Sequence, residues 1–335
     1  MEGSETLGEL GEQRIIEELL RPRYSRHGGV FGDDCAWLPT LGAGNDAVLV
    51  ATTDPCPEPM AIMLGFQDYY YYGWLLGTIN LSDLAAAGAL PLGVLSSLIL
   101  PSETRVGDFV RLLDGLDECC RSVGTEVIGG NLKEGSKVDL TGAAIGICEG
   151  NPPLRRVGSR QGDQVGVVGD LGSFWAGVLS VQRGLSISQS ERASLLKNVL
   201  TPEPKVRVGK RLRELGLVSA SIDNSDGLFP SLRALSQANR VGIELDFREV
   251  EFQSGVAAVA NALRVSPVRL ALGWGDWQLI VTFREGEARR IEDLCASHGL
   301  PFYEVGSIVE GSDLLLRDDE VAGPLDGIGF AALYA

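Results

Sequence analysis

Hydrophobic residues recur along this chain with two different spacings. Intervals of three and four residues predict helices, and the first such stretch covers residues 7–20 and ends at Arg21-Pro22. Runs of β-branched and apolar residues predict strands, and the first covers residues 47–53 and stops at Asp54-Pro55. The remaining helices are expected over residues 69–87, 105–123, 204–215, 255–263 and 285–297, with one more after Gly172. The remaining strands are expected over residues 93–100, 126–128, 138–148, 164–168, 218–222, 242–245, 278–282 and 302–309.

The order of these elements indicates the fold class. Strands and helices mix without strict alternation, so the pattern predicts an α+β fold rather than a doubly wound parallel sheet. The 335 residues exceed one ordinary core and fit two domains, at roughly 100–200 residues per domain. Asn151-Pro152-Pro153 is the predicted boundary, which gives an N-terminal domain of residues 1–150 and a C-terminal domain of residues 151–335.

Charge and composition narrow the possible functions. The chain has 29 Lys and Arg against 45 Asp and Glu, a formal net charge of −16, which argues against a nucleic-acid partner because phosphate backbones need clustered cations. The two histidines are too few for a multi-histidine zinc site, and they argue against histidine acid–base catalysis. The sequence has no signal-peptide pattern and no apolar run approaching the roughly 20 residues of a membrane helix. We therefore expect a cytoplasmic protein with no membrane partner.

Several aspartates lie in unusually apolar surroundings. Asp83 lies within Leu81-Ser82-Asp83-Leu84-Ala85-Ala86, a stretch that is otherwise expected to be buried. A buried carboxylate is unfavourable unless it is paired or bound to a metal, and too few Lys and Arg lie nearby in the sequence to pair them all. One such aspartate alone would more often be a helix cap or turn former, but five together favour a hard cation such as Mg²⁺, which binds carboxylates and substrate phosphates. These five are Asp34, Asp54, Asp83, Asp223 and Asp226.

The segments around these aspartates resemble the thiamine-monophosphate kinase family, within the wider group that includes aminoimidazole ribonucleotide synthetase. Each motif is short, but their order and spacing extend over most of the chain. In order they are Gly32-Asp33-Asp34, Thr52-Thr53-Asp54, residues 80–89 (NLSDLAAAGA), Gly129-Gly130-Asn131, Arg156-Val157-Gly158 before Gly162-Asp163, residues 200–204 (LTPEP) and residues 222–228 (IDNSDGL).

The resemblance implies a fold and an assembly. It implies a two-domain synthetase-like homodimer with ATP sites near the subunit interface. The N-terminal domains would pair their sheets into a shared β-barrel, and an α+β, sandwich-like C-terminal domain would pack beside it. The implied reaction is Mg²⁺-dependent transfer of phosphate from ATP to thiamine monophosphate, a small-molecule acceptor.

The resemblance also assigns roles to residues of this chain. Asp226 and Arg156 are the implied catalytic residues, with Arg156 supplying a fixed cation for the ATP phosphates. Asn131 stands where many members have Asp, although some kinases of the family have Asn there. The implied Mg²⁺ ligands are Asp34, Thr53, Asp54, Asp83, Asp223 and Asp226. The implied ATP contacts are Gly130, Asn131, Arg156 and Ser225.

The substrate side differs from the family pattern. The kinases have Gly-Gly-Glu-Asp-Tyr-Glu-Leu, whereas residues 273–279 here read GWGDWQL, so Gly275 replaces the Glu that helps hold the thiamine moiety. Ala61 and Ile328 replace a His and an aromatic residue. Trp274 and Trp277 add bulk at the same turn, where they would either restore stacking or fill the pocket. A changed acceptor without a fixed positive charge, and weak turnover of thiamine monophosphate, are therefore expected.

Two further functions stay open at this stage. An ATP-dependent ligase or cyclase of the aminoimidazole ribonucleotide synthetase type would use a related nucleotide site. A nucleotide-binding dimer that has lost turnover would act as a regulatory or assembly partner. The Thr-Thr-Asp and Asp-x-Ser-Asp-Gly segments favour the kinase over the ligase. Retention of nearly every acidic residue argues against a lapsed site, which should lose buried charges that are unfavourable without a ligand.

Overall fold

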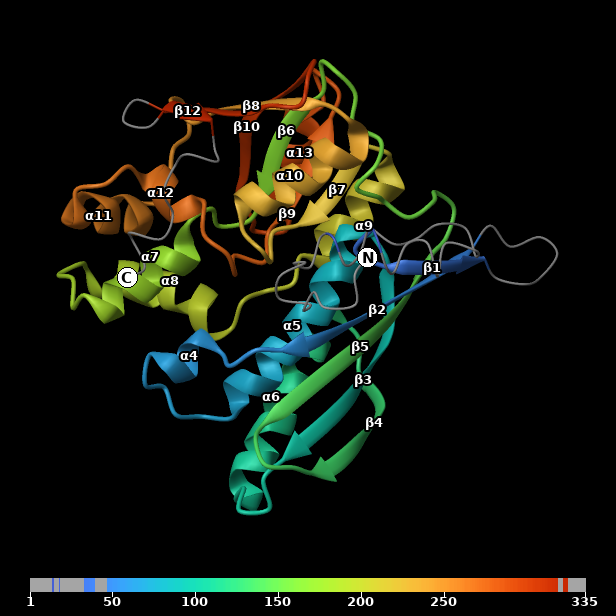
Figure 1. Ribbon diagram of the computed structural model, residues 1–335, viewed down its shortest axis with the longest axis vertical. Helices are drawn as coiled ribbons and strands as arrows, with labels where there is room; N and C mark the ends of the chain where they lie inside the picture. Colours follow the sequence, from blue (N-terminus) through green and yellow to red (C-terminus); the bar gives the residue numbers. More distant parts are fainter. Residues whose placement is uncertain (1–13, 15–17, 19–32, 40–46, 319–321, 325–335) are drawn as a thin grey trace.

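The computed structural model describes residues 14, 18, 33–39, 47–318 and 322–324. The helix expected over residues 7–20 falls almost entirely outside these residues, as does Ile328. Within the described residues the strands form two separate sheets, one of five strands and one of seven. Helices and strands mix in each, and the expected α+β class is confirmed (Figure 1).

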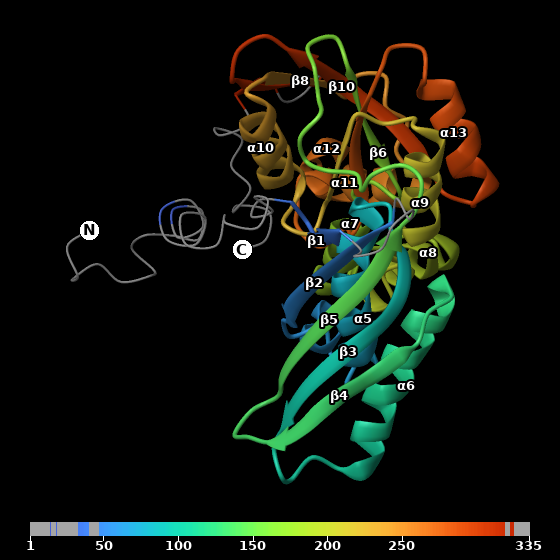
Figure 2. The same ribbon diagram turned by 90° about the vertical axis from the view of Figure 1, so that its right-hand side faces the viewer.

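The five-stranded sheet has the order β1-β2-β5-β3-β4. Its strands are β1 (Ala36–Pro39), β2 (Val48–Cys56), β3 (Leu90–Leu100), β4 (Val127–Glu134) and β5 (Asp139–Cys148). β3 and β4 run parallel, and the other neighbours are antiparallel. The helices α5 (Tyr70–Ala86) and α6 (Val106–Val123) cover one face, and the opposite face carries no helix among the described residues (Figure 2). The sheet is therefore open on one side, and it is not closed into a barrel.

Strand β2 continues beyond the point where the sequence predicts its end. Asp54 and Pro55 lie inside the strand, paired with Gly142 and Thr141 of β5. Proline cannot donate a backbone hydrogen bond and is tolerated where one side of a strand is free. The neighbour β1 pairs only with residues 48–51, so this part of β2 has a free side among the described residues. The prediction that Asp54-Pro55 stops the strand was therefore wrong.

Helices α5 and α6 approach each other closely because glycines lie at their contact. A Cβ added at Gly73 would lie 1.8 Å from the Leu112 carbonyl oxygen, and one at Gly115 would lie 2.0 Å from the Tyr70 carbonyl oxygen. No larger side chain fits at either position unless the helices separate. This close contact holds α5 against the sheet, and residues 76–86 of the helix are all buried.

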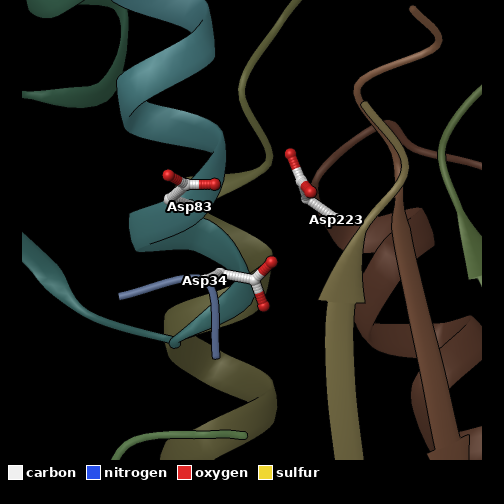
Figure 3. Close-up of side chains that lie close together, drawn as sticks. All are labelled: Asp34, Asp83 and Asp223. Carbon is white, nitrogen blue, oxygen red and sulfur yellow. The ribbon is translucent and has the colours of Figure 1, made fainter. Parts of the chain in front are cut away.

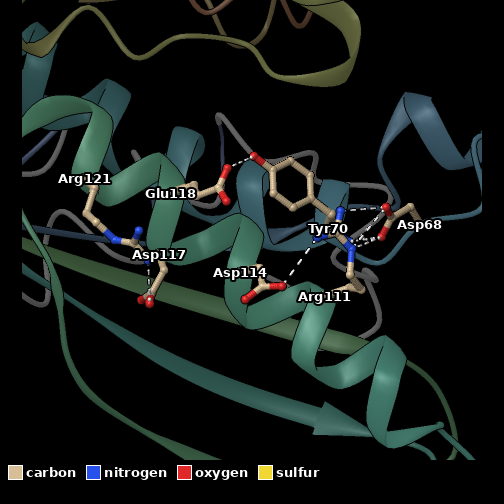
Figure 4. A network of polar contacts seen from close by, with 7 residues as sticks. All are labelled: Asp68, Tyr70, Arg111, Asp114, Asp117, Glu118 and Arg121. Carbon is tan, nitrogen blue, oxygen red and sulfur yellow. Dashed lines mark hydrogen bonds and ion pairs between the residues drawn. The ribbon is translucent and has the colours of Figure 1, made fainter.

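Polar contacts also join the exposed ends of these helices (Figure 4). The Arg111 Nη2 atom of α6 donates to Asp68 Oδ2 at 2.8 Å, and its guanidinium lies 4.8 Å from the centre of the Tyr70 ring. The Tyr70 hydroxyl donates to Glu118 Oε2 at 2.7 Å. Exposed ion pairs of this kind stabilise a fold by about 0–1 kcal/mol each, so the network fixes the start of α5 more than it supplies stability.

The seven-stranded sheet has the order β12-β11-β8-β10-β6-β9-β7. One face packs with α5, α9 and α13 in a core shared with the first sheet, and the other packs on α10 and α12. A third core joins α7, α8 and α11. The strands are β6 (Gln164–Val168), β7 (Ala220–Asp223), β8 (Gly242–Asp246), β9 (Leu279–Phe283), β10 (Phe302–Val309), β11 (Leu314–Arg317) and β12 (Ala322–Pro324). The helices are α7 (Ser173–Gln182), α8 (Gln189–Leu200), α9 (Val206–Leu215), α10 (Leu228–Asn239), α11 (Ser254–Leu263), α12 (Pro267–Ala271) and α13 (Ala288–Ser297).

Seven elements were not predicted, namely β1, α4 (Met60–Met63), α8, α10, α12, β11 and β12. Helix α8 lacks a strong apolar stripe, but it begins with a complete capping box. The side chains of Ser188 and Glu191 each accept a hydrogen bond from the other residue's backbone N–H. The Ser-x-x-Glu spacing could have revealed it. No described helix has the length and hydrophobicity needed to cross a membrane.

Candidate functional site

Three carboxylates from distant parts of the chain meet where α5 lies against the second sheet (Figure 3). Asp34 precedes β1, Asp83 lies in the last turns of α5, and Asp223 ends β7. One oxygen from each lies within 4.8 Å of the others. The structure therefore brings together three of the six residues expected to bind Mg²⁺.

Hydroxyl groups orient two of these carboxylates. The Thr52 hydroxyl of β2 donates to Asp83 Oδ2. The Ser82 hydroxyl donates to Asp223 Oδ2 at 2.9 Å, and the Ser225 hydroxyl donates to Asp223 Oδ1 at 3.1 Å. Strand β2, helix α5 and the end of β7 are thus connected through the site itself.

The negative charge in this cluster exceeds the positive charge. Burial, followed by the neighbouring carboxylates, raises the pKa of Asp83 well above its ordinary value. Burial and the nearby Asp34 raise the pKa of Asp223 to about 7. Burial also raises the pKa of Asp34, although Arg156 opposes the shift. Three carboxylates that resist ionisation together offer a hard, all-oxygen donor set, which fits a divalent cation such as Mg²⁺.

Arg156 is the cation that contacts this cluster. Its Nη2 atom donates to Asp34 Oδ1 at 2.7 Å. Burial opposes its charge, but Asp34 and then the other carboxylates outweigh that effect and raise its pKa. The buried Nε atom has no hydrogen-bond partner among the described residues, so the guanidinium keeps a free donor beside the carboxylates. Such a donor suits a phosphate oxygen.

Beside the cluster lies a pocket of about 460 Å³. Its lining combines carboxylates with apolar and aromatic side chains. Asp223 belongs both to this pocket and to the carboxylate cluster, so the two form one continuous site. The lining residues are Asp54, Pro55, Pro57, Ile79, Asp223, Ser225, Asp226, Trp274 and Trp277.

The loop that carries the two tryptophans is tightly held. The Gly275 backbone N–H donates to the Ser225 carbonyl oxygen at 2.8 Å. The Asp276 carboxylate accepts from the backbone N–H groups of Gly172 and Phe174, at 3.2 and 3.1 Å, at the start of α7. Burial raises the pKa of Asp276 to about 7 despite these two donors. Trp277 has a φ of +49°, a backbone conformation that is uncommon for a large residue and marks strain near a functional site.

Other residues expected in the site lie outside the carboxylate cluster and the pocket. The exposed Thr53 lies on the side of β2 opposite Thr52, and its hydroxyl donates to the Gly142 carbonyl oxygen at 2.8 Å. Ala61 is fully buried in α4 and does not line the pocket. Gly130 and Asn131 lie on the exposed strand β4, outside the cluster and the pocket.

Sequence reasoning also missed several contributors. Strand alternation in β2 places Thr52 and Asp54 on the face toward α5 and Thr53 on the other, so this pattern could have identified Thr52. Asp33 accepts from the Arg155 Nε atom at 2.8 Å and from the Arg156 backbone N–H at 3.0 Å. No sequence signal indicates those contacts, because the partners lie more than 120 residues apart.

Comparisons with known proteins match most of the chain. Residues 32–148 match the family described as AIR synthase related protein, N-terminal domain, and residues 160–319 match AIR synthase related protein, C-terminal domain. The chain is 29% identical to a thiamine-monophosphate kinase from Methanospirillum hungatei over 310 residues, which cover 92% of this chain and 96% of that relative. It is 32% identical to a thiamine-monophosphate kinase from Methanopyrus kandleri over 240 residues, which cover 71% and 72% of the two chains. A solved structure described as "AaThiL complexed with AMPPCP and TMP" has a TM-score of 0.80 and 26% identity, and the match covers 95% of this chain and 97% of that one.

Proposed function

Because this chain belongs to the AIR synthase related family and, within it, to the thiamine-monophosphate kinases, we propose that it is a Mg²⁺-dependent kinase that transfers the terminal phosphate of ATP to thiamine monophosphate. The observation that carries the proposal is the meeting of Asp34, Asp83 and Asp223 beside a pocket that Asp223 shares with two tryptophans. Such a site offers groups for a metal with phosphates and for a planar organic molecule. The expected family relationship is confirmed.

The proposed chemistry depends on position and charge. Asp34, Asp83 and Asp223 would hold Mg²⁺, whose positive charge would offset the charge that develops on the transferred group. Arg156 is proposed to direct its free Nε–H toward a phosphate of ATP. Asp54 and Asp226, which line the pocket beside Asp223, are proposed to complete the ligand set. Thr53 stays a predicted ligand. In the structure its hydroxyl donates to the Gly142 carbonyl oxygen.

The proposed acceptor needs no strong general base. A phosphate monoester loses its second proton with a pKa near 6, so its oxygen is already a nucleophile near neutral pH. His298 is exposed at the end of α13, outside the pocket lining, where its Nδ1 atom lies 3.0 Å from the Leu294 carbonyl oxygen. The site described here therefore suits phosphoryl transfer that relies on alignment and electrostatics rather than on proton removal.

A homodimer is the proposed active form. Strand pairing places Asp54, Gly142, Ser96 and Gly130 in one row across β2, β5, β3 and β4. Three strand spacings of about 4.8 Å separate Asp54 from Gly130 by about 14 Å. We infer that an ATP site that uses both Asp54 and the Gly130-Asn131 segment draws on two copies of the chain. Pairing of the open N-terminal sheets into a shared barrel would provide this arrangement.

The other candidate functions have less support. The relatives described above are named thiamine-monophosphate kinases, which supports thiamine monophosphate over a changed acceptor and phosphoryl transfer over ligation. The solved neighbour was obtained with AMPPCP and TMP, which supports a paired nucleotide and acceptor site. A site that had lost turnover would be expected to lose its three buried carboxylates, because buried carboxylates without a bound cation are unfavourable.

The direct test is an activity assay. The purified protein is incubated with ATP, Mg²⁺ and thiamine monophosphate, and the products are identified by mass spectrometry. We expect thiamine diphosphate and ADP in equal amounts, and no product when EDTA is present. ATP consumption with other acceptors but not with thiamine monophosphate would overturn the proposed acceptor. The absence of ATP consumption with any acceptor would overturn the proposed kinase activity.

A further inference from the structure

Trp274 forms an exposed aromatic wall of the pocket. It is 45% exposed and lines the same pocket as Asp54 and Asp226. The pocket keeps a volume of about 460 Å³ in its presence, which is enough for a small organic molecule. The sequence alone left open whether this residue blocks or lines the site. The structure shows that it lines the site.

The Trp274 ring contacts two aromatic neighbours, which are both buried. The Trp175 ring lies at 85° to it with a centroid distance of 5.3 Å, and the Trp175 indole N–H donates to the Trp274 carbonyl oxygen at 2.8 Å. The Phe174 ring lies 5.8 Å away at 48°. Edge-to-face contacts of this kind are favourable and directional. The aromatic wall is therefore preorganised rather than free to rotate.

The backbone that follows Trp274 is also held in place. Asp276 accepts two backbone N–H groups at the start of α7, which is the helix that carries Phe174 and Trp175. Gly275 donates to Ser225, which also lines the pocket. The loop thus connects Trp274 to the segment that carries Asp223 and Asp226.

A side chain at position 275 would be strained in this backbone conformation. Gly275 has a φ of +87°, which only glycine adopts readily, and a Cβ there would lie 3.0 Å from the Phe174 ring. With no side chain at position 275, attraction of a positive charge by an aromatic ring of this pocket falls to Trp274 and Trp277, of which Trp277 is buried and Trp274 is exposed. The faces of aromatic rings attract cations, and tryptophan does so most strongly.

We propose that Trp274 determines acceptor specificity by presenting its indole face to a planar heteroaromatic cation, the ring end of the phosphorylated acceptor. This inference rests on the proposed kinase function and adds the group that recognises the acceptor. It also predicts that the enzyme keeps its preference for a charged ring although Gly275 carries no carboxylate. The aliphatic and proline side chains of Ile79, Pro55 and Pro57 complete the apolar part of the same pocket.

The test measures binding and turnover separately. Calorimetry with Mg²⁺ and AMPPCP present gives the affinity for thiamine monophosphate and for its thiophene analogue, in which carbon replaces the charged ring nitrogen. Wild type is compared with Trp274→Ala and Trp274→Phe. Leu215→Ala, at an equally exposed apolar residue at the end of α9, is the matched control. Steady-state kinetics then give KM for the acceptor and for ATP.

We expect Trp274→Ala to weaken thiamine monophosphate binding about tenfold and to remove the preference over the neutral analogue. Trp274→Phe should retain most of both, and KM for ATP should change less than twofold in every variant. Unchanged acceptor affinity in Trp274→Ala, or an equal rise in both KM values, would overturn the inference. Tight, tryptophan-dependent binding without turnover would instead overturn the kinase function and leave the inference standing. No binding by wild type would overturn both.

Discussion

Hydroxyl groups orient the buried carboxylates of the site without neutralising them. Thr52 donates to Asp83, and Ser82 and Ser225 donate to Asp223, but none of these groups carries a charge. The carboxylates are therefore held in position while burial, and after it their mutual repulsion, opposes their ionisation, as the raised pKa values of Asp83 and Asp223 indicate. Such an arrangement favours binding of a cation over stability of the free protein.

This charge balance predicts that nucleotide binding depends on Mg²⁺. Asp83→Asn removes one negative ligand with little change in shape, and we expect it to weaken Mg²⁺-dependent binding of AMPPCP at least tenfold. Calorimetry on wild type and variant, each with Mg²⁺ and with EDTA, measures the effect. Asp108→Asn, at an acidic residue in the first turn of α6, should behave like wild type. Equal AMPPCP affinity with Mg²⁺ and with EDTA would contradict the shared-metal site.

Asp276 predicts a dependence of stability on pH. Its pKa in the folded protein is about 7, above the ordinary value of 3.8, so the folded state binds this proton more tightly than the unfolded state. The contribution of the protonated Asp276 carboxyl to the free energy of unfolding is complete below about pH 4. It is lost as the pH rises through 7, by up to about 1.4 kcal/mol per pH unit. Urea titrations at about pH 4.5 and about pH 7 give the free energy of unfolding of wild type relative to that of Asp276→Asn. This difference should be smaller at the higher pH. A difference that is the same at both pH values would refute this assignment.

Among the elements, α5 depends on its close contact with α6. Gly115→Ala would bring a Cβ within 2.0 Å of the Tyr70 carbonyl oxygen, so the helices must move apart. Overpacking of this kind typically lowers the free energy of unfolding by about 1–3 kcal/mol. Chemical denaturation of the variant should show this loss, together with weaker nucleotide binding because α5 carries Asp83.

The matched control lies on the same helix. A Cβ at Gly107 of α6 meets nothing within 4 Å, so Gly107→Ala should leave stability unchanged or raise it by about 0.5–1 kcal/mol. If both alanine variants changed the free energy of unfolding alike, helix propensity rather than close packing would determine the effect of these substitutions.

Local patterns predicted most of these elements but not their grouping. The apolar run that contains Asp83 predicted both a buried helix and a carboxylate in need of a cation. Alternation along β2 holds enough information to separate Thr52 from Thr53, yet the strand was expected to stop at Asp54 because a proline follows. The meeting of Asp34 with Asp223 depends on how two sheets pack on α5, and residues so far apart in sequence leave no local signal of their contact.

At the scale of the whole molecule, the uncovered face of the first sheet predicts self-association. Leu92 and Leu95 of β3 and Ile128 of β4 are all exposed, and β4 is an open edge in the described chain. Exposed apolar residues beside an open edge are typical of an interface, and a two-fold dimer would cover both. Light scattering at micromolar concentration should give twice the chain mass of 35.7 kDa.

A charge on this face should disrupt that assembly. Leu95 pairs with Ala143 and Gly129 on the uncovered side of the sheet, so Leu95→Glu should shift the protein toward monomer and lower its kinase activity. Leu215→Glu introduces the same charge at an exposed residue of α9 and should remain dimeric. A wild-type protein that scatters as a monomer would rule out the shared barrel.

The hydrogen bond between Ser82 and Asp223 joins residues 141 positions apart, whereas Thr52 lies 31 positions before Asp83. A ligand that needs both carboxylates can bind only after both sheets have docked on α5, so occupancy reports completion of folding. By mass action, ligand at a hundred times its Kd adds about 2.7 kcal/mol to the native state. That increment opposes the separate opening of either half, so nucleotide and metal concentrations should govern resistance to proteolysis throughout the chain.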